Sequence, residues 1–153
     1  MKKLLFTLFL LGSFFTLSAQ TRTAGSAKNE AMELLREEGY APRLDEDDDI
    51  ALKIQGYNYY IIITGQGDGS IFVTFGTNFT TDQPYQKILE ACNVANRSKN
   101  VIKYYTSKDD DGDVRYFINY EAFINPRDDF RSFLRDALTL LPSAVEEFLS
   151  DNE

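Results

Sequence analysis

The chain of 153 residues contains no histidine, and its single cysteine is Cys92. The missing histidine excludes Ser-His-Asp and Cys-His catalytic sets, histidine general bases, and the usual zinc and iron ligand sets. A lone cysteine cannot form an internal disulfide. Cys92 falls on the apolar face of an expected helix, so we interpret it as a small buried hydrophobic residue. We therefore expect a protein that is not an enzyme and has no cofactor.

The chain also lacks a phosphate-binding loop and any excess of positive charge. The glycine-rich segment 65–69 is followed by neither a lysine nor a helix start, so it does not match a P-loop. Lys and Arg number 16 against 24 Asp and Glu, a net charge of −8 that argues against nucleic acid and anionic lipid as partners. The acids leave a hydrolase with two catalytic carboxylates as a less favoured alternative, but no pair stands out.

The first 19 residues have the pattern of a secretory signal peptide. Lys2 and Lys3 precede an apolar run over residues 4–11. The small residues Ser18 and Ala19 follow it, and this stretch is shorter than the about 20 apolar residues of a membrane-spanning helix. We predict cleavage after Ala19. The product would be a soluble periplasmic or secreted protein, not inserted in a membrane, whose net charge falls from −8 to −10 with the loss of the two lysines.

Beyond the signal peptide, the chain has the length of one domain. Residues 20–28 are small and polar, so we expect a flexible leader there and a single domain over 29–150. Hydrophobic periodicity predicts three helices and five strands: helices over 29–38, over 85–98 and after Asn125-Pro126, and strands over 50–55, 57–64, 71–75, 101–106 and 114–120. This order, αβββαββα, predicts an α+β fold with an antiparallel sheet of about five strands flanked by helices. Pro142 predicts a kink or a new start in the last helix.

The acidic segment 107–116 (SKDDDGDVRY) raises the question of a calcium site. With Gly112 at position 6 of an EF-hand loop, position 1 is Ser107 and position 12 is Ile118, whereas calcium needs carboxylates at both. Asp-Gly is a preferred turn dipeptide and the flanks alternate like strands, so we predict a hairpin tip and no metal site. The acidic run 44–49 is interpreted in the same way, as a solvated loop. The hairpin carboxylates remain candidates for weak surface cation binding: Asp109, Asp111 and Asp113.

Both faces of the expected sheet carry apolar side chains. Ile61 and Ile63 alternate with Tyr60 and Ile62, for example. A sheet that is apolar on both faces must be covered on both sides or must bind something. Either the terminal helices cover it, or one face is a surface for a protein partner or a second copy of the chain. The residues that we expect on the partner-facing side are Lys53, Tyr60, Ile62, Phe72 and Phe117.

Two stretches resemble YbjN-like domains. Residues 33–63 (ELLREEGYAPRLDEDDDIALKIQGYNYYIII) combine a helix ending in Gly-Tyr, an acidic stretch, a strand, a glycine and a tyrosine-rich strand. Residues 91–105 (ACNVANRSKNVIKYY) resemble the middle helix of those domains, with Asn93 and Asn96 placed before the next strand. The succession covers nearly all of residues 29–150.

The resemblance implies a fold similar to that of type III secretion chaperones, within a family labelled as sensory transduction regulators. It implies a sheet used for protein binding and brings no catalytic residues. This chain departs from secretion chaperones by its predicted export signal, because they work in the cytoplasm. We interpret Asn93 and Asn96 as helix C-terminal capping and strand-edge hydrogen-bonding residues. We therefore expect an exported, non-enzymatic protein-binding or regulatory module. The alternative is a small-ligand or divalent-cation-binding protein that uses the acidic loops.

Overall fold

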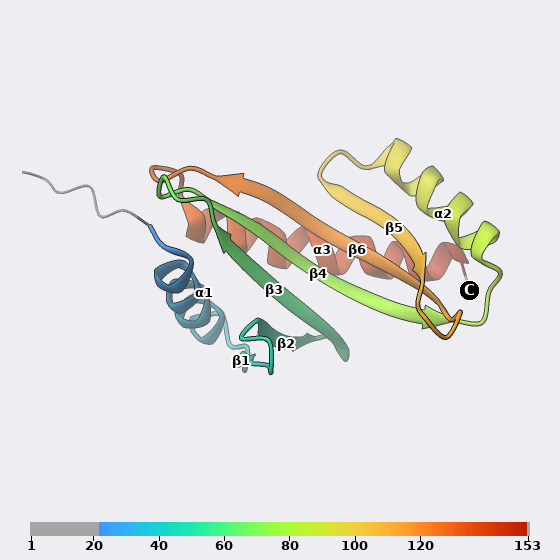
Figure 1. Cartoon of the computed structure of the whole chain (residues 1–153), viewed down its shortest axis with the longest axis horizontal. Helices are drawn as coiled ribbons and strands as arrows, with labels where there is room; N and C mark the ends of the chain where they lie inside the picture. The colour runs from blue at the N-terminus through green and yellow to red at the C-terminus, as the bar shows by residue number, and fades with distance from the viewer. Residues whose placement is uncertain (1–21, 153) are drawn as a thin grey trace, which may run out of the picture.

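The computed structural model describes residues 22–152. They form three helices and a six-stranded antiparallel sheet with the strand order β1-β2-β3-β4-β6-β5 (Figure 1). The predicted α+β class and the order of its elements are confirmed, with one short strand added. The elements are α1 Ala24–Glu37, β1 Arg43–Leu44, β2 Ile50–Ile54, β3 Tyr57–Gly65, β4 Ile71–Thr81, α2 Tyr85–Ser98, β5 Ile102–Lys108, β6 Val114–Ile124 and α3 Phe130–Asn152.

The additional strand β1 arises from the acidic run, which is a hairpin and not only a solvated loop. Leu44 pairs with Ile50, and the Asp45 N–H donates to the Asp49 carbonyl at 2.9 Å. The Asp45 carboxylate accepts from the backbone N–H groups of Asp47 and Asp49, which closes the turn. Side-chain to backbone bonds of this kind are what make aspartate a turn residue. The predicted strand count of about five therefore becomes six.

The predicted hairpin at 107–116 is confirmed, and it repeats the same turn. The Asp109 N–H donates to the Asp113 carbonyl at 3.0 Å, and the Asp109 carboxylate accepts from Asp111 N–H and Asp113 N–H. Gly112 takes a φ of +88°, a left-handed conformation that glycine adopts without steric cost. Strands β5 and β6 flank this turn as an antiparallel pair.

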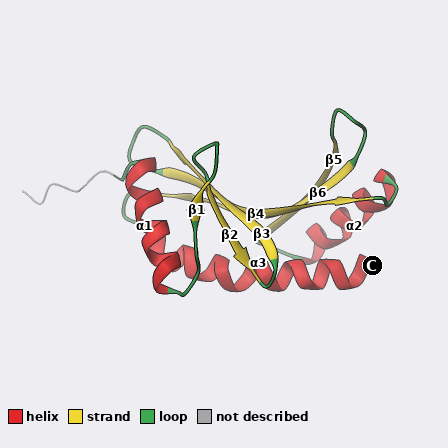
Figure 2. Cartoon of the chain, turned by 90° about the horizontal axis from the view of Figure 1, so that it is seen from below, coloured by secondary structure: helices red, strands yellow, loops and turns green. Residues whose placement is uncertain are grey.

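The helices lie on one side of the sheet (Figure 2). Helix α3 runs beneath the long strands, while α1 and α2 lie toward opposite ends of the same side. The core fills the space between them because alternate strand residues point toward the helices. The largest aliphatic and aromatic side chains without solvent exposure there are Leu34, Leu35, Ile50, Ile61, Ile71, Phe75, Ile118, Leu134 and Leu141.

Helix α1 begins at Ala24, earlier than the predicted start at residue 29. The Thr23 hydroxyl accepts from Ser26 N–H at 3.1 Å, and Ser26 Oγ accepts from Thr23 N–H at 2.9 Å. This reciprocal cap satisfies two N–H groups that a helix start otherwise leaves open. The predicted flexible leader is therefore wrong over residues 24–28, which form the first turns of the helix. The predicted signal peptide, 1–19, lies outside the described residues.

Helix α3 continues through Pro142 without the new start that the proline made us consider. Proline removes one hydrogen bond from the helix, at a cost of about 3 kcal/mol. Leu141 and Val145, on either side of it, are fully buried, and this packing offsets the lost bond. Within residues 22–152, no helix has the length and apolar character needed to span a membrane.

Candidate functional site

The sheet face opposite the helices is the first candidate surface, here called the helix-free face. None of the described helices covers it (Figure 2), and large apolar side chains on it stay in contact with solvent. Ile62 is 39% exposed, Phe72 36% and Phe123 51%. The five residues predicted on the partner-facing side all lie on this face. Its members include Lys53, Tyr60, Ile62, Phe72, Thr74, Lys103, Tyr105, Phe117, Asn119, Glu121 and Phe123.

A glycine creates space at the centre of the helix-free face. Gly76 of β4 is paired with Tyr60 on one side and Asn119 on the other. A Cβ atom on Gly76 would lie 2.1 Å from Asn119 Oδ1 and 2.7 Å from the Tyr60 hydroxyl oxygen. The Tyr60 hydroxyl instead donates to Asn119 Oδ1 at 2.9 Å across this space. The glycine thus allows a hydrogen bond between side chains of two strands that are not neighbours in the sheet.

The amide of Asn119 extends this bond into a network over the sheet. Asn119 is only 2% exposed, and its Nδ2 donates to Glu121 Oε1 at 3.1 Å and to the Tyr105 hydroxyl at 3.3 Å. Lys103 Nζ lies 3.3 Å from Glu121 Oε2 and 5.2 Å from the centroid of the Tyr105 ring. A fully bonded polar group of this kind fixes the surrounding side chains in one arrangement.

The tyrosine of this network is a weaker acid than a free tyrosine. Burial, and then the neighbouring Tyr105, raise the pKa of the Tyr60 hydroxyl well above its usual value, although the bond to Asn119 lowers it. A phenol with a raised pKa stays protonated at neutral pH and acts as a donor. The site therefore offers fixed hydrogen-bonding groups and no activated nucleophile at this position.

An open depression of about 420 Å³ lies over the network. The rings of Tyr105 and Phe117 stack in it with centroids 4.7 Å apart. Asp45 and Asp49, from the β1–β2 hairpin, also line it. Burial and the neighbouring Asp45 raise the pKa of the Asp49 carboxyl. Aromatic rings and carboxylates that line the same opening are suited to binding cations.

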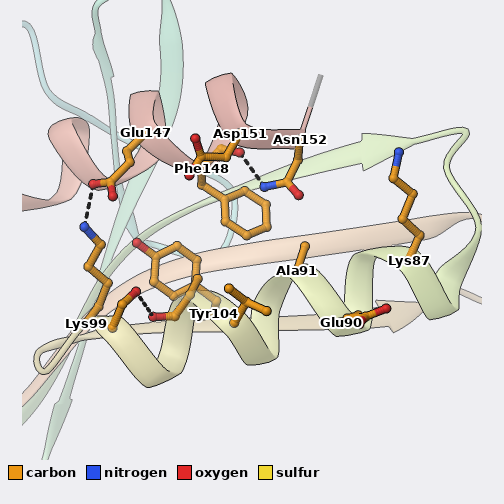
Figure 3. A pocket seen from close by; sticks show the side chains of 12 residues that line it. Lys87, Glu90, Ala91, Lys99, Tyr104, Glu147, Phe148, Asp151 and Asn152 are labelled. Carbon is orange, nitrogen blue, oxygen red and sulfur yellow. Dashed lines mark hydrogen bonds and ion pairs between the residues drawn. The ribbon is translucent and has the colours of Figure 1, made fainter.

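A second opening, the α2–α3 groove, has a volume of about 380 Å³ (Figure 3). Tyr104 and Phe148 stack in it with ring centroids 5.2 Å apart, and Ala91 of α2 lines it. An ion pair between Lys99 and Glu147 joins the two helices at one end (Figure 3). Charges of both signs surround this groove, so its electrostatics select no class of ligand.

Asn96 of α2 binds the outer edge of β5. Its Nδ2 donates to the Tyr104 carbonyl at 2.7 Å, and its Oδ1 accepts from the Tyr104 N–H at 2.9 Å. The predicted strand-edge role of Asn96 is therefore confirmed. The predicted capping role of Asn93 is wrong, because α2 continues to Ser98 and leaves Asn93 in its interior. The Asn96 side chain thus takes the place of a missing neighbouring strand beside β5.

Replacing Asn96 by alanine is expected to lower the free energy of unfolding by about 1 to 3 kcal/mol. Two backbone groups of Tyr104 lose their partner, and the open edge becomes available to another chain. Asn93→Ala is the matched control, because the exposed Asn93 side chain makes no hydrogen bond within residues 22–152. Urea unfolding with sedimentation velocity should give a destabilised, self-associating Asn96→Ala variant. Equal behaviour of the two variants would contradict the edge role.

The described residues contain neither an exposed thiol nor a cluster of metal ligands. Cys92 is 1% exposed, and burial raises the pKa of its thiol to about 11, in agreement with its interpretation as a small buried residue. Within residues 22–152, no three or more acids or cysteines lie together in a way that could hold a metal. Asp109 is engaged in its own turn and with Arg115, at 3.1 Å, so the candidates Asp109, Asp111 and Asp113 do not converge.

The strand periodicity could not reveal several members of the site. Phe123 was missed because the predicted last strand ended at residue 120, whereas β6 continues to Ile124. Asn119 and Gly76 did carry a signal. A polar residue and a glycine, each inside an apolar strand, indicate a close approach of chains. Their pairing depends on the β4–β6 register, which alternation alone does not specify.

Comparison with known proteins gives a family and a fold. The family model YbjN, described as "Putative bacterial sensory transduction regulator", matches residues 32–150. A crystal structure of YbjN from E. coli, called a putative transcription regulator, is similar with a TM-score of 0.64 at 11% identity, covering 86% of this chain and 94% of that one. An uncharacterized protein from Methanothermobacter thermautotrophicus has a TM-score of 0.56 at 12% identity, with coverages of 80% and 94%. No curated protein sequence matches the chain.

Proposed function

The chain belongs to the YbjN family, and we propose that it is an exported, non-enzymatic regulatory module that binds a protein partner through its helix-free face. The observation that carries this proposal is the exposure of Ile62, Phe72 and Phe123 on one side of the sheet. Soluble proteins rarely leave contiguous apolar patches in water, and those that do often use them for binding. On the helix side of the same sheet, by contrast, the apolar strand residues Ile61, Phe75 and Ile118 have no solvent exposure.

The helix-free face is also organised in the way that a protein interface requires. Aromatic side chains surround a polar network in which Asn119 is satisfied without any partner. Fixed aromatic side chains lose little conformational entropy on binding and are enriched in interface centres. Tyr60, Tyr105 and Phe117 have this character. The face is therefore suited to a partner that covers rings and leaves the internal bonds intact.

Regulation through protein contacts fits the charge of the chain. The family is described as a sensory transduction regulator, and the similar E. coli protein is called a putative transcription regulator. A protein that contacts DNA directly needs lysine and arginine toward the phosphates. This chain carries 24 Asp and Glu against 16 Lys and Arg. The proposal is accordingly regulation by binding a protein, without contact to nucleic acid.

Export and the absence of catalysis rest on the sequence. Lys2, Lys3 and the apolar run 4–11 support a signal peptide cleaved after Ala19, which places the module in the periplasm or outside the cell. The chain has no histidine, and its one thiol is buried with a raised pKa. Both facts disfavour the common routes of nucleophilic catalysis.

The proposal is tested by making the helix-free face polar. The change is Ile62→Ser with Phe72→Ser, and the matched control on the helix side is Val94→Ser with Leu140→Ser, also exposed apolar residues. Formaldehyde cross-linking in cells that produce the tagged full chain should give a specific adduct, reduced about tenfold or more by the first pair only. An adduct of twice the chain mass identifies a second copy as the partner. Equal adduct from both variants would contradict the proposal.

A further inference from the structure

We propose that the depression on the helix-free face receives a lysine or arginine side chain from a basic segment of the partner. This inference rests on the proposed function and adds the chemistry of the partner. It is carried by the arrangement of rings and carboxylates around one opening.

Carboxylates from separate elements face the same depression. Asp45 and Asp49 come from the β1–β2 hairpin, and Glu121 comes from β6. Among the described residues that line the opening, none is a lysine or an arginine. A cationic side chain entering it therefore meets no like charge among the lining groups, although Lys103, just outside the lining, is already paired with Glu121 at 3.3 Å.

The lining of the depression also provides aromatic rings. Tyr60, Tyr105 and Phe117 line it, and the last two stack at a centroid distance of 4.7 Å. A guanidinium or ammonium group placed over such rings gains a cation–π attraction, and its methylene stem packs on apolar surface. Ile62, in the same lining, offers that apolar surface for the stem.

The protein already places one of its own cations in this kind of environment. Lys103 Nζ lies 5.2 Å from the centroid of the Tyr105 ring and 3.3 Å from Glu121. Its side chain is 59% exposed and is not part of the lining. The contact demonstrates that a ring and a carboxylate of this face together accommodate an ammonium group.

The carboxylates of the β1–β2 hairpin lie close to one another. The Asp49 carboxyl has a pKa raised by burial and by its neighbour Asp45, so the charged form is destabilised there. A partner cation relieves this repulsion when it binds. A bare metal ion fits less well, because within residues 22–152 no three acids lie around one point. A long side chain, in contrast, reaches between separated groups.

The charge pattern also favours a basic partner over a second copy. In a two-fold dimer the same surface patch meets itself, so the acids Asp45, Asp49 and Glu121 of both copies would be brought into one interface. Like charges brought together in an interface are unfavourable. The chain as a whole has a net charge of −8, which attracts a basic segment from a distance.

Three labelled peptides of 11 residues, the length of β4, provide the test. One alternates lysine with leucine, and the other two have glutamine or glutamate in place of lysine. Fluorescence anisotropy with the full chain should show saturable binding of the lysine peptide alone. Affinity should fall about fivefold or more between about 50 mM and about 300 mM NaCl, since salt screens exposed charges.

The decisive comparison uses two triple variants that lose the same charge. Asp45→Asn with Asp49→Asn and Glu121→Gln removes the acids of the depression, and asparagine retains the turn-closing oxygen of Asp45. This variant should bind the lysine peptide about tenfold more weakly. The control, on the exposed surfaces of α1 and α3, should stay within about twofold of the unmodified chain. This control variant combines Glu33→Gln, Asp136→Asn and Glu146→Gln.

Each outcome decides between the two proposals. If both triple variants bind the lysine peptide equally weakly, the peptide is attracted only by the net charge of the chain. That result overturns the cation site. Absence of binding, or binding of the glutamine peptide with the same affinity, overturns it as well. If the Ile62→Ser/Phe72→Ser pair abolishes the cellular adduct while the peptides fail, the proposed function stands without this inference. If both experiments fail, both are wrong.

Discussion

Replacing Gly76 by alanine is expected to lower the free energy of unfolding by about 2 to 4 kcal/mol, because the new methyl group has no space. Its Cβ would lie 2.1 Å from the Asn119 amide oxygen and 2.7 Å from the Tyr60 hydroxyl oxygen. Asn119 is 2% exposed and bonded on both ends of its amide, so it cannot move without losing hydrogen bonds. Urea unfolding measures the change.

The matched control for this substitution is Gly25→Ala. Gly25 lies in the first turn of α1, and a Cβ there meets nothing within 4 Å. Alanine should leave stability unchanged or raise it by up to about 1 kcal/mol, as expected for a helix position. In an Asn119→Ala background the cost of Gly76→Ala should fall by about 1 kcal/mol or more, because the closest clash is gone. A cost of Gly76→Ala as small as that of Gly25→Ala would contradict the packing described here.

Truncating Phe148 to alanine is expected to cost about 3 to 5 kcal/mol of unfolding free energy, the range for removing a buried phenylalanine. Phe148 is 4% exposed. Its ring centroid lies 5.2 Å from that of Tyr104 and 5.4 Å from that of Tyr116, so it joins the C-terminal part of α3 to β5 and β6. Thermal and urea unfolding measure the loss. Hydrogen exchange should accelerate most in the last turns of α3.

The control for Phe148 is on the same helix. Leu140 is 43% exposed, and Leu140→Ala should change the stability by less than about 0.5 kcal/mol. A Phe148→Ala variant that loses no more stability than Leu140→Ala would show that α3 is not held to the sheet by this ring cluster.

Alternation along the strands was enough to group the residues of the helix-free face. Because successive side chains of a strand point to opposite sides, Tyr60 and Ile62 had to share a face, and the same holds for each strand taken alone. Alternation alone does not determine which face the helices cover, since both faces are apolar. That choice depends on how α3 packs beneath β4 and β6, a contact between segments far apart in the chain.

The centre of the candidate site shows more clearly what strand alternation cannot predict. Strands β4 and β6 pair along eleven positions, yet α2 and β5 separate them in the chain. Gly76 meets Asn119 only in this register, and a shift by one residue would turn every side chain to the other face.

The start of helix α1 was missed for a different reason. The Thr23-x-x-Ser26 spacing was visible, but serine is a less familiar partner in a capping box than glutamate.

The central claim is that the helix-free face is the surface on which a protein partner binds. Its most direct test is a photoreactive amino acid placed at Ile62 in the full chain, compared with one at Leu140 on the helix side. The two residues have similar exposure, 39% and 43%. Irradiation of producing cells should yield a discrete protein adduct from position 62 and only background from position 140. Equal adducts from both positions, or an adduct from position 140 alone, would contradict the account.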